Sequence, residues 1–579
     1  MSETNPLTGY PSVDKPWLKY YSEDAINAPL PEYSIYEYLV ENNKDALDSI
    51  AINYFGRRFS YRELFLLIDR AAVAFMEIGI QPGDTVTLVM LSCVSSVVSL
   101  YALNKIGAVC NFIDVQASQA YMEELMRDAE SKYVVTMDTF CNRVINATKA
   151  CGGLKIVVCS FADYMPLASK LRLIKQMFNS DHSYRSESIC ITWKDFLANS
   201  QRDVSYEFSK NPHTTCLLAH TSGTTGKPKT VLLSDEALNC VTQNYLYSMP
   251  HKRGEVFLSV MIPYVVYGTL INVHMPLCLG LETVLIPHFD ASKWPYYIKK
   301  YKPHHSCSIP AYVSSMLEDK TLAQMDLSGL LTVGIGGDGM TVALEKKLNA
   351  FLESHGSTAK IQKGYGLSET CATAILEFKN ASKVGSVGIP LVKNVAAAFD
   401  SDNKEECQYG ESGEICLQCA SFMLGYKGAE NKDDSLMQTH PDGTCWLHTG
   451  DIGYVDEDGF VFLQGRMKRM IITIENGVAS KVSPSNIEEV LNGYPNVRES
   501  CVVGITCGNN RRLKAYIAMS QACNMEESER SLRDLCSKEL SEHMQPYMYE
   551  FVSKLPHTGS GKINYRELEE NTTEDSPRT

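Results

Sequence analysis

Short, mostly uncharged apolar runs recur along this chain and are separated by longer amphipathic stretches. A strand without a polar face must be covered on both sides, which is typical of parallel sheets between layers of helices. The clearest runs are 132–137, 155–159, 216–219, 283–287, 331–336 and 413–417. We therefore expect an α/β fold with largely parallel sheets covered by helices, followed from about Gln464 by a smaller α/β unit.

The charge and cysteine content narrow the class of protein. Lys and Arg number 54 against 68 Asp and Glu, a formal net charge of −14, and nucleic-acid phosphates require clustered cations. The 19 cysteines are odd in number, and Cys416-x-x-Cys419 has no second pair at the spacing of a zinc site. We expect free thiols in a cytoplasmic protein, and no nucleic acid as a partner.

One stretch, 86–103, is uncharged and long enough to suggest a helix that spans a membrane. It contains four serines and follows the turn sequence Gln81-Pro82-Gly83-Asp84. We expect a buried strand at 86–91 and a helix from about 93 to 105 instead. The first 16 residues are polar and lack the apolar core of a signal peptide.

The segment 165–178 combines an apolar face with basic charge. Its four apolar and three basic residues at helical spacing are Leu167, Leu171, Ile174, Phe178, Lys170, Arg172 and Lys175. Such a helix can lie on an anionic membrane surface. An ordinary surface helix that packs its apolar face inward is the favoured interpretation, and the membrane contact is kept as the alternative.

The strongest chemical signal is Thr221-Ser222-Gly223-Thr224-Thr225-Gly226-Lys227-Pro228-Lys229, directly after the run 216–219. Small residues let the backbone approach a ligand, and their N–H and hydroxyl groups can surround phosphate oxygens. Lys227 and Lys229 add positive charge. The Walker spacing is absent, so the loop predicts phosphate binding of another type.

Four further motifs follow in order: Gly364-Tyr365-Gly366-Leu367-Ser368-Glu369, Thr449-Gly450-Asp451, Gly465-Arg466 and Pro556-His557-Thr558-Gly559-Ser560-Gly561-Lys562. With the phosphate loop, they resemble the adenylate-forming enzymes, which include acyl-CoA synthetases, luciferases and peptide-synthetase adenylation domains. The resemblance covers about 35–568. It implies an N-terminal extension at 1–34, a large domain of stacked sheets with the ATP and acyl sites at 35–466, a small mobile domain at 467–568 and a flexible tail at 569–579.

The resemblance also implies catalytic roles. Adenylation needs the negative charge at the α-phosphate to be neutralised, and Lys562 would supply a cation there. Ser368 would donate to the α-phosphate. Glu369 would hold Mg²⁺ on the phosphates, with Thr225 as a second ligand, because hard cations prefer oxygen. Arg469 stands at the position of the interdomain hinge.

In the family, the nucleotide contacts come from the same motifs. Tyr365 would offer a flat face to adenine, and Asp451 and Arg466 would reach the ribose. Gly336 and Gly337 are carried over as backbone positions beside the adenine and acyl pockets. The expected ATP-binding residues are Thr221, Ser222, Gly223, Thr224, Thr225, Gly226, Lys227, Gly336, Gly337, Gly364, Tyr365, Gly366, Asp451 and Arg466.

Several positions depart from the family pattern. In the family, a Gly usually follows the lysine that corresponds to Lys229, but this chain has Thr230 there. Asp235 replaces a common His. The region 263–268 has only apolar residues and Tyr267 where many members have a gating His or Trp. Arg469 replaces an Asp, and the stretch 474–481 is longer than usual. These departures leave the gating of the acyl site and the choice of the thiol acceptor open.

The acid substrate is inferred from the acyl pocket. Phe289-Asp290-Ala291-Ser292 resembles the ammonium-binding sequence of peptide synthetases, but its position before a helix makes Asp290 a helix cap. Candidate pocket residues are Tyr264, Tyr267, Ile309 and Pro310. An apolar pocket implies an apolar acid, so we expect a medium- or long-chain fatty acid.

These features predict an AMP-forming acyl-CoA ligase that uses ATP, Mg²⁺ and coenzyme A. Too few residues follow Lys562 for a carrier domain, so the acceptor is free CoA or a separate acyl carrier protein. The alternatives are an adenylating enzyme that loads an acyl or amino acid onto a separate carrier, and a non-catalytic homologue, which the intact motifs disfavour. We expect a cytoplasmic protein, peripheral at the inner membrane surface if 165–178 binds lipid.

Overall fold

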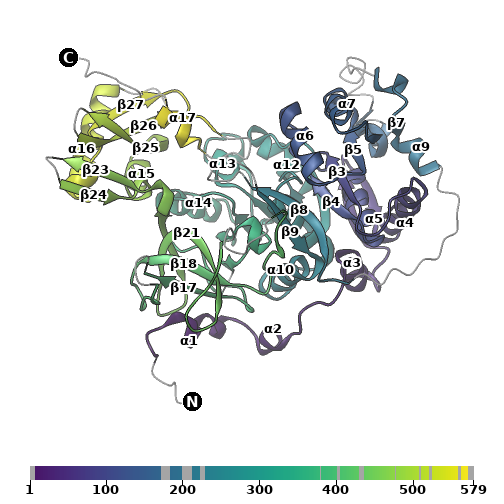
Figure 1. Cartoon of the computed structure of the whole chain (residues 1–579). Helices are drawn as coiled ribbons and strands as arrows, with labels where there is room; N and C mark the ends of the chain where they lie inside the picture. The colour runs from purple at the N-terminus through teal and green to yellow at the C-terminus, as the bar shows by residue number, and fades with distance from the viewer. Residues whose placement is uncertain are drawn as a thin grey trace.

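Two large, mainly parallel sheets form most of the protein. The computed structural model describes residues 7–167, 169–170, 183–198, 211–221, 229–378, 380–400, 404–428, 436–475, 478–507, 510–520, 524–557 and 563–570. Figure 1 shows both sheets within a helical cover, with the last part of the chain set to one side. The α/β prediction is therefore confirmed.

The first sheet has eight strands in the order β19-β9-β8-β4-β3-β5-β6-β7. Strands β3 to β8 run parallel, and β9 and β19 add an antiparallel edge. The strands are β3 (Thr85–Val89), β4 (Val109–Phe112), β5 (Tyr133–Met137), β6 (Lys155–Cys159), β7 (Cys190–Thr192), β8 (Thr215–Thr221), β9 (Lys229–Ser234) and β19 (Gly425–Tyr426).

The second sheet has nine strands in the order β16-β15-β14-β13-β12-β10-β11-β1-β2, with a parallel centre and antiparallel edges. The strands are β1 (Ile50–Tyr54), β2 (Arg57–Ser60), β10 (Val256–Ser259), β11 (Glu282–Leu285), β12 (His305–Ser308), β13 (Thr332–Ile335), β14 (Ile361–Tyr365), β15 (Ile375–Leu376) and β16 (Ile389–Pro390).

Helices cover both sheets. They are α3 (Ile35–Asn43), α4 (Tyr61–Glu77), α5 (Val94–Lys105), α6 (Gln119–Asp128), α7 (Cys141–Ala150), α9 (Trp193–Ala198), α10 (Asp235–Ser248), α11 (Met275–Cys278), α12 (Trp294–Tyr301), α13 (Pro310–Ser314) and α14 (Val342–Ser354). The uncharged stretch 86–103 becomes β3 and the buried helix α5, as predicted. Within the described residues, no helix has both the length and the apolar character to cross a bilayer.

A third sheet differs from the expectation of parallel strands, because all of its pairings are antiparallel. It consists of β17 (Val395–Phe399), β18 (Gly413–Gln418), β20 (Met437–Thr439), β21 (Cys445–Val455) and β22 (Val461–Arg466). The apolar run 413–417 is its strand β18. A buried strand is apolar whether it runs parallel or antiparallel to its neighbours, so an apolar run alone does not reveal the orientation of the strand.

The N-terminal segment packs on this third sheet. It forms α1 (Pro11–Asp14), a 3₁₀ turn and α2 (Glu23–Asn27); α1 lies beside β17 in Figure 1. Trp17 is fully buried in a cluster with Phe399 and Trp446. The Tyr21 hydroxyl donates to the Pro390 carbonyl at 2.9 Å. The segment is therefore an integral layer of the large domain.

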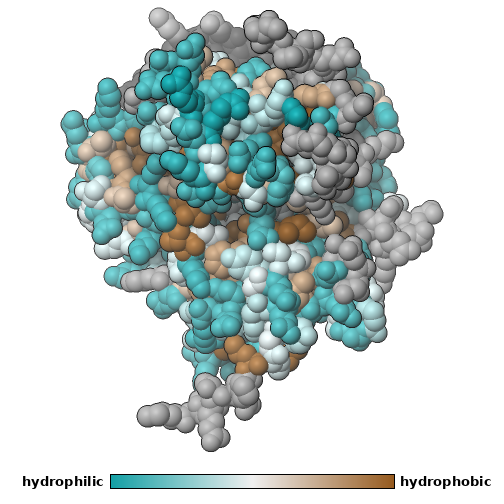
Figure 2. All heavy atoms as spheres, turned by 90° about the vertical axis from the view of Figure 1, so that its left-hand side faces the viewer, coloured by the Kyte–Doolittle hydropathy of each residue, from teal (hydrophilic) through white to brown (hydrophobic). Residues whose placement is uncertain are grey.

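The C-terminal unit, residues 471–570, has its own sheet and core. Its elements are β23 (Ile471–Glu475), β24 (Val478–Val482), α15 (Pro484–Asn492), β25 (Val497–Cys507), β26 (Asn510–Met519), α16 (Met525–Glu539), β27 (Met548–Val552) and α17 (Tyr565–Glu570). Buried apolar side chains from β23, α15, β26 and α16 fill that core. The face of the molecule on this side is largely hydrophilic (Figure 2). The predicted domain bounds stay a prediction.

Truncating Trp17 tests the packing of the N-terminal segment. Loss of a buried Trp side chain costs about 3–5 kcal/mol, so Trp17→Ala should lower the melting temperature of the large domain by several degrees. Leu7→Ala is the matched control, because Leu7 is 51% exposed and exposed positions change stability by only about 0.5 kcal/mol. Differential scanning calorimetry measures both, and equal melting curves would contradict the assigned packing.

Candidate active site

The two ends of the predicted phosphate loop lie side by side. Strands β8 and β9 form an antiparallel hairpin whose last pair is Thr221 and Lys229, and the Thr221 hydroxyl donates to the Lys229 carbonyl at 3.4 Å. The loop residues Ser222, Gly223, Thr224, Thr225, Gly226 and Lys227 lie outside the described residues. Their phosphate and metal roles therefore stay predictions.

A partly buried polar network supports the base of this hairpin and includes Thr230. The Thr230 hydroxyl donates to Asp128 Oδ2 at 2.8 Å, and His220 Nδ1 lies 3.2 Å from Thr230 Oγ1. His220 Nε2 lies 2.6 Å from Asn111 Oδ1. Burial lowers the pKa of His220 to about 4, so the ring is neutral near pH 7. Glycine at position 230 would remove the donor to Asp128.

Glu369 lies close to the start of β9. It belongs to a 3₁₀ turn, Ser368–Thr370, that packs against β8 and β9. Its carboxylate is buried, and Oε1 accepts a hydrogen bond from the Tyr426 hydroxyl at 2.7 Å. The Lys229 ammonium lies 4.7 Å from the centroid of the Tyr426 ring, a cation–π distance. Tyr426 thus connects a cation and a carboxylate that the sequence motifs place far apart.

The backbone after Glu369 is strained. Cys371 and Ala372 both have left-handed φ angles, +54° and +75°, which non-glycine residues rarely adopt. Gly366 lies against this turn: a Cβ added there would stand 2.4 Å from the Ala372 carbonyl oxygen. The glycine of the predicted motif is therefore required by the close approach of two backbone segments.

Tyr365, Asp451 and Arg466 meet at one point. The Tyr365 hydroxyl donates to Asp451 Oδ2 at 2.6 Å, and Arg466 Nε lies 3.1 Å from Asp451 Oδ1. Asp451 and Arg466 face each other across β21 and β22. Burial and the Asp451 carboxylate raise the pKa of Tyr365, so the phenol keeps its proton. The structure brings together three residues that the sequence analysis assigned to the nucleoside.

The predicted acyl-pocket residues Tyr267 and Ile309 lie beside the two glycines that follow β13. A Cβ on Gly336 would stand 3.5 Å from the Tyr267 ring and 3.4 Å from the Gly364 carbonyl oxygen. Gly337 has φ +80°, and its Cβ would stand 3.7 Å from Ile309 Cγ2. Apolar side chains therefore line the backbone that separates β13 from β14.

Tyr267 also begins a π-helix, Tyr267–His274, which the sequence did not indicate. The Tyr267 hydroxyl donates to the Ser308 carbonyl at 3.1 Å and fixes the ring. Gly268 cannot carry a side chain, because a Cβ would stand 1.8 Å from the Ile262 carbonyl oxygen. π-Helical turns are frequent at functional sites. Pro310, the fourth predicted pocket residue, is buried at the start of α13.

Tyr264 has a different neighbour from the one expected. A hydrogen bond joins it to the Asp114 carboxylate, and burial together with this carboxylate raises the pKa of Tyr264. Asp114 was not predicted as a neighbour of Tyr264, because it follows β4, far from 264–268 in the chain. Asp290 is a cap, as predicted: its Oδ1 accepts from the Ser292 N–H at 3.1 Å ahead of α12.

Arg469, the predicted hinge residue, is fixed to the C-terminal unit. Its guanidinium binds both oxygens of Glu488 on α15, with N–O distances of 2.9 and 2.5 Å. It also lies 5.1 Å from the centroid of the Tyr565 ring on α17. A rotation about this region would therefore have to occur on the N-terminal side of Arg469, in the segment that follows Arg466.

Lys562 lies outside the described residues, but the base of its loop does not. His557 and Ile563 form an isolated β-bridge, so the two ends of 558–562 are adjacent. His557 Nε2 lies 3.1 Å from Glu499 Oε2 on β25. The catalytic role of Lys562 stays a prediction. The basic segment 165–178 likewise falls mostly outside the described residues.

Comparison with known proteins gives consistent matches along the chain. The family model "AMP-binding enzyme" matches residues 39–427, and "AMP-binding enzyme C-terminal domain" matches 486–562. A long-chain-fatty-acid–CoA ligase of Bacillus subtilis (strain 168) is 26% identical over 97% of this chain and 98% of its own length. A probable 4-coumarate–CoA ligase of Dictyostelium discoideum is 22% identical over 95% and 97%.

A solved structure, an anthranilate CoA ligase in complex with anthranoyl-AMP, superposes with a TM-score of 0.80. It is 23% identical in sequence and covers 95% of this chain and 98% of its own. At that identity, the likeness establishes the fold.

The Arg469–Glu488 pair yields a test of the hinge assignment. Removing one partner of a largely buried, bidentate pair costs about 3–5 kcal/mol, so Arg469→Ala should lower the melting temperature of the C-terminal unit. Arg62→Ala is the matched control: its pair with Asp48 is 54% and 87% exposed, and such pairs contribute about 0–1 kcal/mol. Limited digestion of the C-terminal unit by chymotrypsin, which does not need the arginine, should accelerate only in the first variant; equal rates would contradict the anchoring role.

Proposed function

Because the chain belongs to the AMP-binding enzyme family and is an AMP-forming acid–CoA ligase, we propose that its acid is a medium- or long-chain fatty acid. One observation carries the proposal. Tyr267 and Ile309 present apolar surface to the backbone at Gly336 and Gly337, where the family places the acyl group. The similarity to a fatty-acid–CoA ligase supports it.

In this proposal, Asp451 accepts hydrogen bonds from the ribose hydroxyls and Arg466 holds that carboxylate in place. ATP binding would bring the ribose to the carboxylate that now meets the Tyr365 hydroxyl. Residues 222–227 and Lys229 would surround the phosphates. Ser368, next to Glu369 in the same turn, would donate to the α-phosphate.

Glu369 fits a magnesium site. Its buried carboxylate accepts from a neutral phenol, and within the described parts of the chain no Lys or Arg forms an ion pair with it. A carboxylate oxygen is a ligand that Mg²⁺ prefers. Glu369 and Thr225 would hold Mg²⁺, and the ion would neutralise phosphate charge.

The reaction has two steps in this proposal. The carboxylate oxygen of the acid attacks the α-phosphorus of ATP, and pyrophosphate leaves. The thiol of CoA then attacks the acyl carbon of acyl-AMP, and AMP leaves. Lys562 would stabilise charge in the first step only, and the C-terminal unit would rotate between the steps.

A panel of acids tests the substrate. ATP–pyrophosphate exchange should be supported by fatty acids and should rise with chain length. Each buried CH₂ contributes about 0.8 kcal/mol, so two more carbons should raise kcat/KM roughly tenfold until the pocket is filled. Benzoate, coumarate and amino acids are the comparison acids. A flat chain-length profile, or best activity with an aromatic acid, would contradict the proposal.

Lys562→Ala tests the division of labour between the two steps. Adenylation should fall by at least about a hundredfold, because a positioned cation at the reacting phosphate is lost. Thioester formation from supplied acyl-AMP and CoA should be retained. Stopped-flow measurement of each half-reaction separates the two, and an equal loss in both would remove Lys562 from its assigned role.

One observation favours a second candidate, an enzyme that loads an amino acid onto a separate carrier protein. Asp114 stands beside Tyr264, and a carboxylate there could pair with a substrate ammonium. Asp114→Asn distinguishes the candidates: it should abolish amino-acid-dependent exchange in that enzyme and leave fatty-acid exchange nearly unchanged in ours. A peripheral membrane contact through 165–178 stays the alternative to an ordinary surface helix, and binding to anionic vesicles tests it.

A further inference from the structure

The Thr449-Gly450-Asp451 motif is a bulge in β21. On β18, Glu414 faces Ile452 and Cys416 faces His448. Between these two pairs, one residue of β18 is therefore opposite three residues of β21, 449–451, and Gly450 adopts φ +72°. A bulge re-aims a side chain and leaves backbone groups without strand partners. Here it directs Asp451 toward Tyr365 and Arg466.

Side chains satisfy the backbone groups that the bulge releases. The Thr449 hydroxyl donates to the Ile415 carbonyl at 2.6 Å and accepts from the Asp451 N–H at 3.1 Å. The Gly450 N–H donates to Glu414 Oε1 at 2.9 Å. Buried N–H groups are costly when unpaired, so Glu414 fixes the middle residue of the motif.

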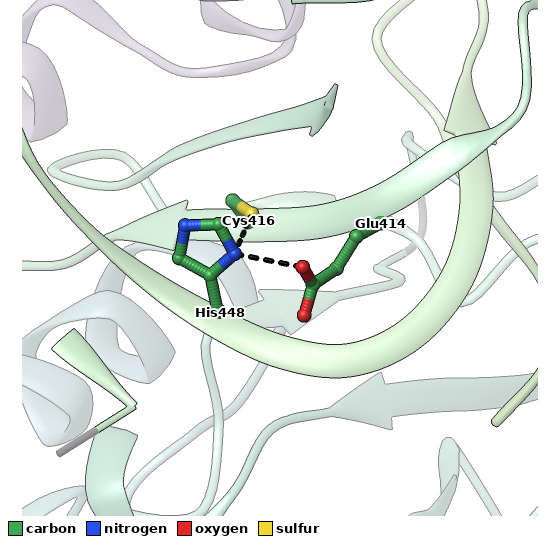
Figure 3. Close-up of side chains that lie close together, drawn as sticks. All are labelled: Glu414, Cys416 and His448. Carbon is green, nitrogen blue, oxygen red and sulfur yellow. Dashed lines mark hydrogen bonds and ion pairs between the residues drawn. The ribbon is translucent and has the colours of Figure 1, made fainter. Parts of the chain in front are cut away.

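Figure 3 shows what holds Glu414 in turn. Its second oxygen, Oε2, accepts a hydrogen bond from His448 Nδ1 at 2.7 Å. The other ring nitrogen of His448, Nε2, lies 3.0 Å from His440 Nε2, within hydrogen-bond distance. His440 packs edge-on against Phe399, with 4.6 Å between ring centroids. A chain of hydrogen bonds thus connects His440, His448, Glu414 and Gly450.

Glu414 is the carboxylate at the centre of this cluster. Burial would raise the pKa of Glu414, but the hydrogen bonds from His448 and the Gly450 N–H outweigh it and leave that pKa lowered. Burial raises the pKa of Cys416, so the thiol stays protonated 3.4 Å from His448 Nδ1. Glu414 is therefore a carboxylate that bridges two donors.

These residues could also be considered as metal ligands, since Glu414, Cys416 and His448 converge within 4.8 Å and are all buried. The distances favour hydrogen bonding. A separation of 2.7 Å between His448 Nδ1 and Glu414 Oε2 is that of a charge-assisted hydrogen bond, and the other carboxylate oxygen is committed to Gly450. The protonated thiol is a poor ligand.

We propose that Glu414 and His448 are positioning residues for the nucleotide: they hold the bulge so that Asp451 faces the ribose hydroxyls. The inference rests on the proposed role of Asp451 in binding the ribose. Neither residue would touch ATP. Both act through the Gly450 backbone, and their contribution should appear only when the ribose hydroxyls are present.

The experiment compares ATP with 2′,3′-dideoxy-ATP, which lacks the hydroxyls that Asp451 would accept. The measured quantity is kcat/KM with ATP divided by kcat/KM with 2′,3′-dideoxy-ATP, both determined in pyrophosphate exchange. Glu414→Gln keeps the shape of the side chain, but its single oxygen cannot accept from both Gly450 and His448. We expect the ratio to fall about tenfold, as for loss of one well-placed hydrogen bond.

Two substitutions of His448 provide a second test in case the Glu414→Gln protein does not fold. His448→Leu removes the donor to Glu414 and should lower the ratio. In His448→Asn, the amide nitrogen can donate to Glu414 from nearly the position of Nδ1, so the ratio should stay close to that of the unmodified protein. Melting curves of each variant are recorded alongside.

The outcomes separate the inference from the proposed function. Asp451→Asn should abolish the discrimination between the two nucleotides. If it does not, the ribose assignment is wrong and the inference falls with it. If it does, but Glu414→Gln and His448→Leu keep the original ratio, the inference alone is wrong.

Two further results would overturn the inference. An equal loss of kcat/KM for both nucleotides would indicate a purely structural role for Glu414 and His448. Elemental analysis after dialysis against zinc would reveal a metal site as one stoichiometric zinc ion that Cys416→Ser loses. We expect substoichiometric zinc in both proteins.

Discussion

Parallel strands deliver their carboxyl ends to one edge of a sheet, and the candidate site depends on this geometry. Strands β12, β13 and β14 end at Ser308, Ile335 and Tyr365, and the pocket residues, the paired glycines and the strained turn follow them directly. In open α/β sheets, ligands bind outside these ends. The antiparallel pairs β8–β9 and β21–β22 then bring Lys229 and Asp451 to the same region.

Features that are local in the chain can be predicted from the sequence. The small residues 222–226 directly follow strand β8, so the sequence alone predicts a phosphate loop there, and this role stays a prediction. Contacts between segments that are distant in the chain could not be predicted from the sequence. Tyr426 contacts Glu369 from 57 residues away, and Asp114, in the segment after β4, contacts Tyr264. The bulge at Gly450 was also hidden, because it depends on the register between β18 and β21.

Departures from the family pattern are accompanied by local compensation. Thr230 donates to Asp128 where glycine could not. Asp235, in place of a common His, is buried at the start of α10 and accepts from the Ile35 N–H at 2.9 Å and from Asn104 Nδ2 at 2.5 Å. Arg469 pairs with Glu488. Each replacement has partners of matching polarity, so the altered motif residues are integrated into the fold.

The packing of the N-terminal segment constrains how the protein is made. Tyr21 bonds to Pro390, and Ser12 donates to Glu406, across 369 and 394 residues. At ribosomal rates of about 5–20 residues per second, the surface that covers Trp17 emerges on the order of tens of seconds after it. During that interval a tryptophan-bearing segment is exposed on the nascent chain, which makes it a binding target for chaperones and makes the closing of the third sheet a late step of synthesis.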